Sequence, residues 1–542
     1  MTVTTVSTTA FDDQKPGTSG LRKKVSVFQQ PHYVENFIQS IFNNVGSFEG
    51  KLLILGGDGR YLNRTLIQTV LKMAAANGVG YVKVGRGGIL STPAVSHLIR
   101  KYNAHGGIIL SASHNPGGPN GDCGIKYNIS NGGPAPNSLC DAIFTTSQRL
   151  SSYKIVEAPE IDLEVEAKTV IESMQVEIID PVVDYVSLMQ EIFDFDCIAQ
   201  AVSKGLTLRF DAMHAVTGPY AQEIFEKHLG FPQGTVINSV PLPDFGGGHP
   251  DPNLVYAKDL YRLLMSDRGP DLGAASDGDG DRNLIIGRKQ FVTPSDSLAI
   301  MTAHAPLIKG YRQGIAGIAR SMPTGRAVDR VAEEEGLNCF ETPTGWKFFG
   351  TLLDAGKVTF CGEESFGTGS NHVREKDGLW AVLFWLNLLA ATGETVAQIA
   401  QRHWRRYGRF YYLRCDYEEV DTPKAHAMMD QLRAQLPEAG TKIGGLTVKK
   451  ADDFIYHDPI DQTITMQQGV RIFFDHDARI VVRLSGTGTK GTTVRLYFEQ
   501  YENDPCKHDQ EPQKVIQPLQ RAALELLNIK KYLGREQPDI IT

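Results

Sequence analysis

The stretch Gly106-Gly107-Ile108-Ile109-Leu110-Ser111-Ala112-Ser113-His114-Asn115-Pro116-Gly117-Gly118 decides the fold class of this chain. Its first five residues form a short apolar run that predicts a buried strand, and the rest is typical of a loop leaving the carboxyl end of that strand. Ligands of open α/β sheets bind at that end. Ser113, with a neighbouring His and glycines that admit a ligand, is therefore placed to act as a nucleophile or to carry a transferable group. The alternative is an ordinary turn in which Ser and Asn cap the backbone.

The overall composition is typical of a soluble globular protein. With 542 residues the chain exceeds what one hydrophobic core usually serves, which predicts three or four domains. The net charge of −7 offers no general basic surface, so we expect no nucleic-acid partner. Seven scattered cysteines without a C-x-x-C pair argue against a disulfide framework or a thiolate zinc site and favour the cytoplasm. The first ten residues lack leader features, and the most apolar run, Leu379 to Thr392, is too short to span a bilayer, so no membrane partner is expected.

Strand, glycine-rich loop and helix follow one another along the chain and predict four units. The first three are α/β units over residues 1–180, 181–292 and 293–409, and the fourth is an α+β unit over residues 410–542. Strands are expected at Leu52–Leu55, Leu206–Phe210, Gly314–Ala319, Lys357–Phe360, Arg471–Phe474, Arg479–Leu484 and Thr492–Phe498. Helices are expected at Thr65–Asn77, Tyr220–His228, Leu379–Thr392 and Gln513–Leu527.

Three aspartates, Asp277, Asp279 and Asp281, alternate with glycines. This spacing can turn three carboxylates toward one point, and such oxygen ligands suit Mg²⁺ or Ca²⁺. An EF-hand is excluded because Arg282 stands where its turn glycine belongs and Arg288 where its bidentate glutamate belongs. Three like charges this close repel one another unless a cation or Arg282 compensates them, which favours a metal site over a solvated acidic turn.

A second glycine-rich loop, between Arg483 and Arg495, contains G-x-G-x-x-G. A strand-like segment follows it, whereas a dinucleotide fingerprint requires a helix, and Lys490 precedes the glycine that it would follow in a Walker A loop. Hydroxyls and peptide amides flanked by the two arginines suit a phosphate clamp. A plain hairpin loop is the alternative.

Three further stretches carry less information by themselves. The turn from Lys15 to Lys24 can offer amides and Arg22 to an anion, or it can be a solvated loop. Glu363 and Ser365, in a glycine-bounded loop, can bind polyol hydroxyls, although such a pair is common in loops. His114 can orient Ser113 or serve only the structure.

Together and in order, seven short motifs resemble the phosphoglucomutases of the α-D-phosphohexomutase superfamily. They are Lys15–Arg22, Ser111–Gly118, Asp277–Asn283, Thr342–Trp346, Gly362–Gly367, Arg374–Asp377 and Arg483–Arg495. The resemblance covers nearly the whole chain. It implies four domains around a central cleft: three α/β domains with mixed sheets and a C-terminal α+β domain that closes on the substrate phosphate. Ser111 stands where the family usually has Thr, and Lys490 where small residues are common.

The resemblance also implies a role for each matching residue. Ser113 is expected to be the phosphoserine, and Asp277, Asp279 and Asp281, with the Ser113 phosphate, are expected to bind Mg²⁺. Acid/base and electrostatic help is expected from Arg22, His114 and Lys126. The residues expected to bind substrate are Thr18, Ser19, Arg282, Thr344, Gly345, Glu363, Ser365, Lys376, Arg483, Ser485, Gly486, Thr487, Thr489 and Arg495. Among them Glu363 and Ser365 would contact sugar hydroxyls, and the residues of the C-terminal loop would grip the non-reacting phosphate.

The implied reaction interconverts α-D-glucose 1-phosphate and glucose 6-phosphate, with glucose 1,6-bisphosphate as intermediate and activator. Two alternatives remain: a mutase acting on another hexose phosphate, such as mannose phosphate, and a catalytically silent structural relative. The expected partners are small sugar phosphates, and the expected assembly is a monomer or weak dimer.

Overall fold

The computed structural model describes residues 2–17, 19–485 and 491–542. The chain divides into two compact units. The first unit comprises Met1–Phe291, His304–Ile315 and Ser365–Val396, and the second comprises Val292–Ala303, Ala316–Glu364 and Ala397–Thr542.

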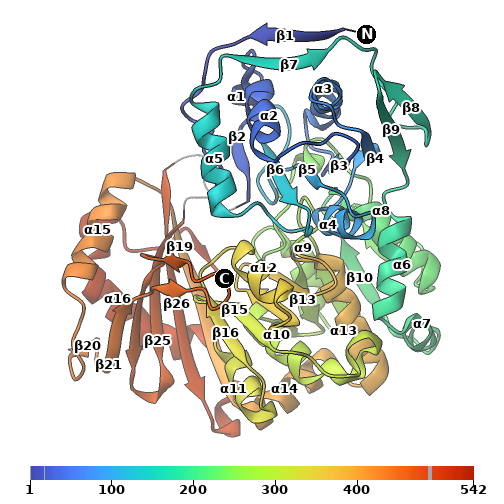
Figure 1. The fold of residues 1–542 in the computed structure, drawn as a ribbon. Coiled ribbons are helices and arrows are strands. Elements are labelled where there is room, and N and C mark those ends of the chain that lie inside the picture. Colours follow the sequence, from blue (N-terminus) through green and yellow to red (C-terminus); the bar gives the residue numbers. More distant parts are fainter. Residues whose placement is uncertain (1, 18, 486–490) are drawn as a thin grey trace. The chain divides into compact units, whose positions relative to one another are not determined.

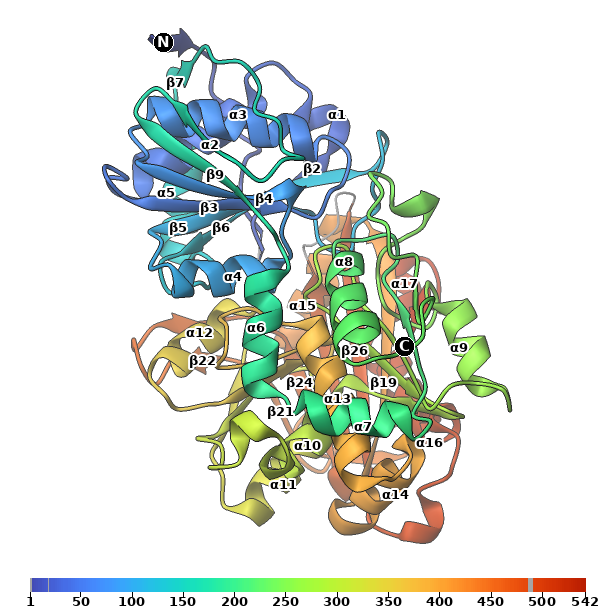
Figure 2. The same ribbon diagram turned by 90° about the vertical axis from the view of Figure 1, so that its right-hand side faces the viewer.

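A mixed seven-stranded sheet organises the N-terminal part of the first unit (Figure 2). Its strand order is β2 (Leu21–Lys24), β6 (Asp122–Ile129), β5 (Gly106–Leu110), β3 (Leu52–Gly57), β4 (Tyr81–Ile89), β9 (Met174–Ile179) and β8 (Lys168–Ile171). Strands β5, β3, β4 and β9 run parallel, and the other pairings are antiparallel. Helices α2 (Tyr33–Asn44) and α3 (Asn63–Ala76) cover one face and α4 (Thr92–Lys101) the other. The predicted buried strand is β5, all of whose residues are buried, so the Ser113 loop leaves a central strand at its carboxyl end.

A second, five-stranded sheet in the first unit carries the acidic loop. Its order is β11 (Val236–Ile237), β10 (Leu208–Asp211), β12 (Leu272–Ala275), β13 (Leu284–Gly287) and β14 (Gln290–Val292). The three aspartates lie between β12 and β13. The helix predicted over Tyr220–His228 is found as α8 (Thr217–Ala221) followed by a π-helix, η1 (Gln222–His228). Over so short a stretch the apolar spacing does not distinguish a π-helix from an α-helix.

The predicted core helix is α13 (Gly378–Thr392), in the first unit. The side chain of Asp377 accepts a hydrogen bond from the Trp380 N–H at 3.1 Å and caps its first turn. No single helix in the described part of the chain is long and apolar enough to cross a membrane; only α13 and α14 (Val396–Tyr407) together reach that length, with a break between them.

The remaining elements of the first unit are shorter or lie at its edges. Strands β1 (Val3–Ser7) and β7 (Ser152–Val156) pair antiparallel. The others are β18 (Gly367–Ser370), α1 (Val25–Phe28), α5 (Asn137–Ser147), α6 (Val183–Ile192), α7 (Phe195–Ser203), α9 (Lys258–Met265), and the 3-10 turns η2 (Phe245–Gly247), η3 (Ala305–Leu307) and η4 (Lys309–Tyr311).

In the second unit, β15 (Ile318–Ser321) pairs in parallel with β16 (Cys339–Thr342) and β17 (Phe360–Glu363). Two of these strands begin later than predicted. Gly314 has φ +92° and closes a turn onto Tyr311, and the Lys357 N–H is bonded to the Leu352 carbonyl at the end of α12 (Lys347–Asp354). Residues whose amides close turns cannot also join the sheet. Helices α10 (Pro294–Ala303) and α11 (Ala327–Glu335) complete this part.

The C-terminal part of the second unit is an antiparallel seven-stranded sheet. Its order is β20 (Lys442–Ile443), β21 (Leu446–Asp453), β24 (Val470–Phe474), β25 (Arg479–Ser485), β26 (Thr492–Glu502), β19 (Arg409–Val420) and β27 (Ile540–Ile541). Helices α15 (Thr422–Ala434) and α16 (Pro512–Leu527) lie against one face (Figure 1), which carries apolar side chains such as Ile480 and Leu496. The alternate residues, Arg483 and Arg495 among them, therefore face the other side. The short elements are β22 (Tyr456–His457), β23 (Ile464–Thr465), η5 (Asp475–Asp477), η6 (Pro505–Lys507) and α17 (Ile529–Leu533).

Candidate active site

Ser113 lies in the loop that leaves β5, and its hydroxyl points at the acidic loop. Its Oγ donates a hydrogen bond to Oδ2 of Asp277 at 2.9 Å. The ring Nδ1 of His114 lies 3.4 Å from the same Oγ. Ser113 is only 2% exposed. Two segments far apart in sequence therefore meet at this hydroxyl, as the resemblance implied.

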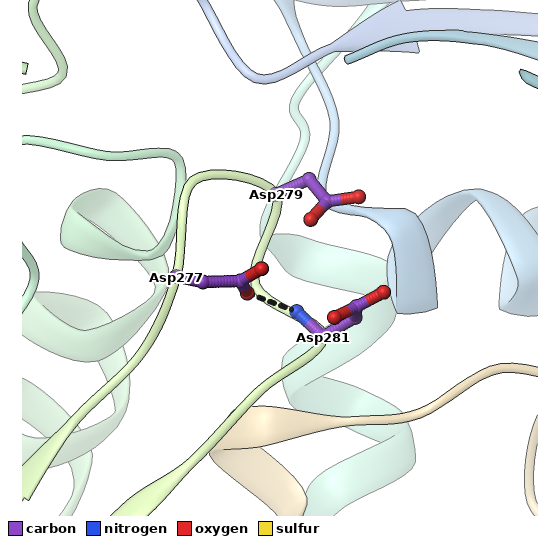
Figure 3. A group of neighbouring side chains, drawn as sticks. All are labelled: Asp277, Asp279 and Asp281. Carbon is purple, nitrogen blue, oxygen red and sulfur yellow. Dashed lines mark hydrogen bonds between the residues drawn. The ribbon is translucent and has the colours of Figure 1, made fainter. Parts of the chain in front are cut away.

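The side chains of Asp277, Asp279 and Asp281 point toward one another (Figure 3). One oxygen of each lies within 4.8 Å of the other two, and all three residues are buried. Oδ1 of Asp277 accepts the N–H groups of Asp281 at 2.9 Å and of Arg282 at 3.0 Å, which folds the loop back on itself. The Oδ1 atoms of Asp279 and Asp281 are buried without a hydrogen-bond partner in the described part of the chain. Buried oxygens of this kind suit a hard divalent cation.

The electrostatics of the triad also favour a cation. Burial raises the pKa of Asp277 well above its usual range, and the carboxylates of Asp281 and Asp279 raise it further. Burial opposes ionisation of Asp279 too, but the Lys126 ammonium, the Thr92 hydroxyl and Lys376 together outweigh burial and bring the pKa of that carboxyl below its usual range. The protein thus compensates the three carboxyl groups unevenly: its surroundings favour the ionised form of Asp279 and the protonated form of Asp277.

Two buried lysines border the triad. Lys126, on β6, forms an ion pair with Asp279, and its Nζ lies 3.9 Å from Oδ2 of Asp281. Nζ of Lys376 lies 3.3 Å from Oδ2 of Asp281. Burial lowers the pKa of Lys126, but the carboxylates of Asp279 and Asp281 more than reverse this effect and raise it. Lys126 is therefore held as an ammonium ion.

The two arginines predicted near the serine have different surroundings. Nη1 of Arg282 donates to Oδ1 of Asp251 at 3.0 Å, and its charge partly offsets the raised pKa of Asp277. The two lysines, which the charge argument on the sequence had not used, form ion pairs with Asp279 and Asp281. Arg22, on β2, has a buried Nη1 without a hydrogen-bond partner among the described residues. Burial lowers the pKa of its guanidinium. A buried donor without a partner is suited to an anion.

The turn that precedes Arg22 lies close to Lys126. Ser19 lines a small cavity of about 30 Å³ together with Lys126 and Glu375. Thr18, the other predicted substrate residue of this turn, lies outside the described residues.

Glu363 is the last residue of β17 in the second unit, and it contacts the predicted substrate loop Thr342–Trp346. It accepts a hydrogen bond from the Gly345 N–H at 2.8 Å. Oγ1 of Thr344 is buried without a hydrogen-bond partner in the chain as described. The structure thus brings Thr344, Gly345 and Glu363 together. Ser365 begins the next segment of the first unit and is 8% exposed.

The predicted phosphate clamp joins β25 to β26. Arg483 pairs across the hairpin with Arg495, and Ser485 lies two pairs closer to the loop, opposite Thr493. Gly486, Thr487 and Thr489 lie outside the described residues. Arg495 Nε lies 3.4 Å from Oδ2 of Asp416, a residue that sequence reasoning missed because only the pairing of β19 with β26 brings it opposite Arg495.

Two other residues of the first unit were also missed. Oγ1 of Thr92, at the start of α4, donates to Oδ2 of Asp279 at 2.5 Å. Glu375 accepts from Asn128 Nδ2 at 2.9 Å, and burial raises its pKa to about 7. Thr92 carries no local signal; Glu375 could have been suspected because the Arg374–Asp377 motif contains it.

Comparison with family models extends the picture to the whole chain. Residues 13–154, 183–290 and 294–407 match alpha/beta/alpha domains I, II and III of phosphoglucomutase/phosphomannomutase, and residues 409–539 match the C-terminal domain of phosphoglucomutase-1. The predicted fold class, three α/β domains with mixed sheets and a C-terminal α+β domain, is confirmed.

Individual relatives of the chain belong to the same family as the matching family models. The chain is 59% identical over 541 residues to a phosphoglucomutase of Rhizobium radiobacter and 50% identical over 555 residues to one of Schizosaccharomyces pombe, with all of each chain covered. Among solved structures it is similar to the open form of the Paramecium exocytosis-sensitive phosphoprotein pp63/parafusin, a phosphoglucomutase, with a TM-score of 0.91, 46% identity, and coverage of 100% of this chain and 99% of that one. On the motifs, the fold and these matches, the chain belongs to the phosphoglucomutase/phosphomannomutase family.

Proposed function

We propose that this protein is a phosphoglucomutase that interconverts α-D-glucose 1-phosphate and glucose 6-phosphate through a phosphorylated Ser113. The observation that carries the proposal is the Ser113 hydroxyl, which lies 2.9 Å from the buried aspartate triad in a chain 59% identical to a phosphoglucomutase. Phosphoryl transfer requires mainly positioning and charge neutralisation. A buried serine beside carboxylates and cationic side chains supplies both.

The triad fits Mg²⁺, because its oxygens converge and two of them have no other partner among the described residues. Asp277, Asp279 and Asp281, with the Ser113 phosphate, would hold the ion, which would neutralise charge on the transferred group. Lys126, held as an ammonium, and Arg22, with its buried donor, would stabilise the phosphoryl oxygens. His114, 3.4 Å from the serine oxygen, is placed to hold the proton that the sugar hydroxyl releases.

The proposed cycle has two transfers. Phospho-Ser113 gives its phosphoryl group to the 6-hydroxyl of glucose 1-phosphate, whose proton passes to the base. The resulting glucose 1,6-bisphosphate turns end for end, and the phosphoryl group on O1 returns to Ser113, which releases glucose 6-phosphate and restores the phosphoenzyme. Glu363 and Ser365 would bind sugar hydroxyls, and Ser19, Arg282, Thr344, Gly345 and Lys376 would add substrate contacts. Arg483, Ser485 and Arg495, with Thr18, Gly486, Thr487 and Thr489, would complete the binding of the phosphates.

We also propose domain boundaries at residues 1–180, 181–292, 293–409 and 410–542, which the ranges of the four family models support. The proposed partners are sugar phosphates alone, without nucleic acid or membrane, and the proposed assembly is a monomer or weak dimer. A cytoplasmic location is supported by the cysteines, since none in the described part of the chain forms a disulfide.

Mass spectrometry of the purified protein tests the proposal. We expect one phosphate on the peptide that contains Ser113, exchange of that phosphate with labelled glucose 1-phosphate, and faster turnover of glucose 1-phosphate than of mannose 1-phosphate. Ser113→Ala should abolish phosphate and turnover, whereas Ser203→Ala, at an exposed serine bonded to the Gln200 carbonyl, should alter neither. A wild-type protein that takes no phosphate from glucose 1,6-bisphosphate with Mg²⁺ would refute the mechanism. Preferential turnover of mannose 1-phosphate would instead change only the assigned sugar.

A further inference from the structure

Ser113 has an uncommon backbone conformation. Its φ is +54°, in the left-handed region that residues other than glycine seldom occupy. Such a conformation persists where the surrounding structure fixes it, and it often marks a functional site. Side chains bond both peptide groups of Ser113: its N–H donates to Oγ of Ser111 at 2.7 Å, and its carbonyl accepts from Nη2 of Arg60 at 2.7 Å.

The carboxylate of Asp58 binds both side chains that contact the Ser113 backbone, Arg60 and Ser111. Nε of Arg60 donates to Asp58 at 2.8 Å to Oδ2 and 3.1 Å to Oδ1, and Oγ of Ser111 donates to Oδ2 of Asp58 at 2.6 Å. The remaining fork nitrogen of Arg60, Nη1, donates to the Asp122 carbonyl at 2.8 Å. Every nitrogen of this guanidinium therefore has a partner. Arg60 is 2% exposed, and Asp58 and Ser111 are fully buried.

The positions of these residues explain how the network reaches the serine. Asp58 and Arg60 directly follow β3, and Ser111 directly follows β5, its parallel neighbour in the sheet. The carboxyl ends of the two strands are thus tied together by side chains. The guanidinium also lies 5.2 Å from the centre of the Phe245 ring.

The acidic loop closes the remaining side of the Ser113 carbonyl. A Cβ at Gly278 would overlap the Ser113 carbonyl oxygen and lie 3.4 Å from Nη2 of Arg60. Gly278 stands between Asp277, which accepts the Ser113 hydroxyl, and Asp279. The carbonyl is therefore enclosed by Arg60 and the acidic loop, and the direction of the serine side chain depends on that enclosure.

We propose that Arg60, anchored by Asp58, is a positioning residue for phosphoryl transfer: it holds the Ser113 carbonyl and so keeps the serine in the left-handed conformation that directs Oγ to Asp277. The inference rests on the proposed function. It assigns Arg60 no contact with substrate, because its nitrogens bond protein groups. It predicts a specific defect in transfer from a protein that still binds sugar phosphate.

The test is Arg60→Met, compared with Arg288→Met as matched control. Arg288 also donates to a carboxylate, Asp271, and to a peptide carbonyl, Gly269, but it lies outside the serine network. Each variant is loaded with labelled phosphate from glucose 1,6-bisphosphate, and single-turnover transfer to glucose 1-phosphate is measured per phosphorylated molecule. We expect a loss of about 10²-fold for Arg60→Met, since small displacements of a reacting group have effects of that size. The KM should change much less than kcat, and Arg288→Met should match the wild type.

Two further variants keep the test decisive. Ser111→Ala removes the acceptor of the Ser113 N–H without opening a large cavity, so it should slow transfer even if Arg60→Met does not fold. Ser111→Thr keeps the hydroxyl and should restore transfer. A wild-type transfer rate in Arg60→Met, or Ser111→Ala equal to Ser111→Thr, would overturn the positioning role while leaving the mutase activity intact. Wild-type protein without phosphate or turnover would overturn both the proposed function and this inference.

Discussion

The substitution Asp277→Asn distinguishes the electrostatic repulsion within the triad from its proposed role as a metal site. The amide keeps the shape of the side chain, and its oxygen can still accept the N–H groups of Asp281 and Arg282, which Asp277 now accepts at 2.9 and 3.0 Å. The change removes one negative charge from a buried cluster. We therefore expect the metal-free variant to be more stable than the wild type and the Mg²⁺-loaded variant to gain nothing from the ion.

The size of the effect follows from the geometry. Carboxylate oxygens within 4.8 Å of one another repel by about 3.5 kcal/mol per pair at an effective dielectric constant of 20. Lys126 and Lys376 offset part of this repulsion, so we expect a net gain of about 1–3 kcal/mol in the free energy of unfolding. Mg²⁺ at about 100 times its dissociation constant should add about 2.7 kcal/mol to the wild type only.

The stability of the metal-free wild type should change with pH in one direction. Because burial and its neighbours raise the pKa of Asp277 in the folded protein, the folded state binds the proton more tightly than the unfolded state. The metal-free wild type therefore loses stability as pH rises from the unfolded pKa, about 3.9, through the raised folded pKa. Asp277→Asn lacks this group, so its advantage should grow with pH.

Urea unfolding with EDTA or with Mg²⁺, at several pH values, measures all three effects. Equal metal-free stability of variant and wild type at pH 8 would show that the triad is not under electrostatic strain. Equal stabilisation of both proteins by Mg²⁺ would place the ion elsewhere.

Three other substitutions test further residues of the proposed mechanism. Gly278→Ala places a methyl group where it would overlap the Ser113 carbonyl, and it should lower kcat by about 10²-fold. The control is Gly350→Ala, where a Cβ meets nothing within 4 Å, and it should leave the steady-state kinetics unchanged. Equal kcat in both variants would contradict the close packing at Gly278. Lys126→Met leaves Asp279 without its buried ion-pair partner and should reduce metal-free stability by about 3–5 kcal/mol, partly recovered with Mg²⁺; denaturation curves unaffected by the change would exclude this pairing. Arg495→Met should raise the KM for glucose 1-phosphate by about 10- to 100-fold with Ser113 still phosphorylated, and an unchanged KM would remove Arg495 from the phosphate site.

Local sequence patterns predicted most of the secondary structure, because burial follows them directly. The apolar run Gly106–Leu110 is β5 without change, and the apolar stretch from Leu379, interrupted only by Asn387, is the buried helix α13. Two strands begin later than predicted because the amides of Gly314 and Lys357 form hydrogen bonds in a turn and at a helix end. Such turn bonds are local, but apolar periodicity does not report them.

The site was predictable to the extent that its residues lie together in sequence. Asp277, Asp279 and Asp281 form one short loop, so their convergence followed from spacing. Their cationic neighbours did not, because Lys126 and Lys376 come from separate segments that only the tertiary fold brings to the triad. Charge reasoning required compensation by a bound cation or by Arg282. The Arg282 charge does act on Asp277, but the reasoning did not find the two lysines.

Sequence motifs alone did not identify Arg60. It follows β3 and belongs to no catalytic motif. Its proposed role depends on the left-handed φ of Ser113, which no sequence pattern predicts. The resemblance implied which groups react, whereas the hydrogen bonds in the structure led to the proposal that Arg60 positions one of them.

The charges around Ser113 link the metal to the phosphate. When all three aspartates are ionised, as metal binding requires, they and the two lysines carry about one net negative charge. Mg²⁺ alone would make the cluster positive, and a phosphoserine, which carries nearly two negative charges, would alone leave about three negative charges in a buried site. Only both together return the cluster to its original balance. Under the proposed mechanism each therefore favours the other, and by linkage the coupling is reciprocal: whatever factor phosphorylation adds to Mg²⁺ affinity, Mg²⁺ adds to the phosphorylated state of Ser113. The acidic triad then acts as more than a metal ligand, since its surplus charge makes the phosphoenzyme depend on the ion.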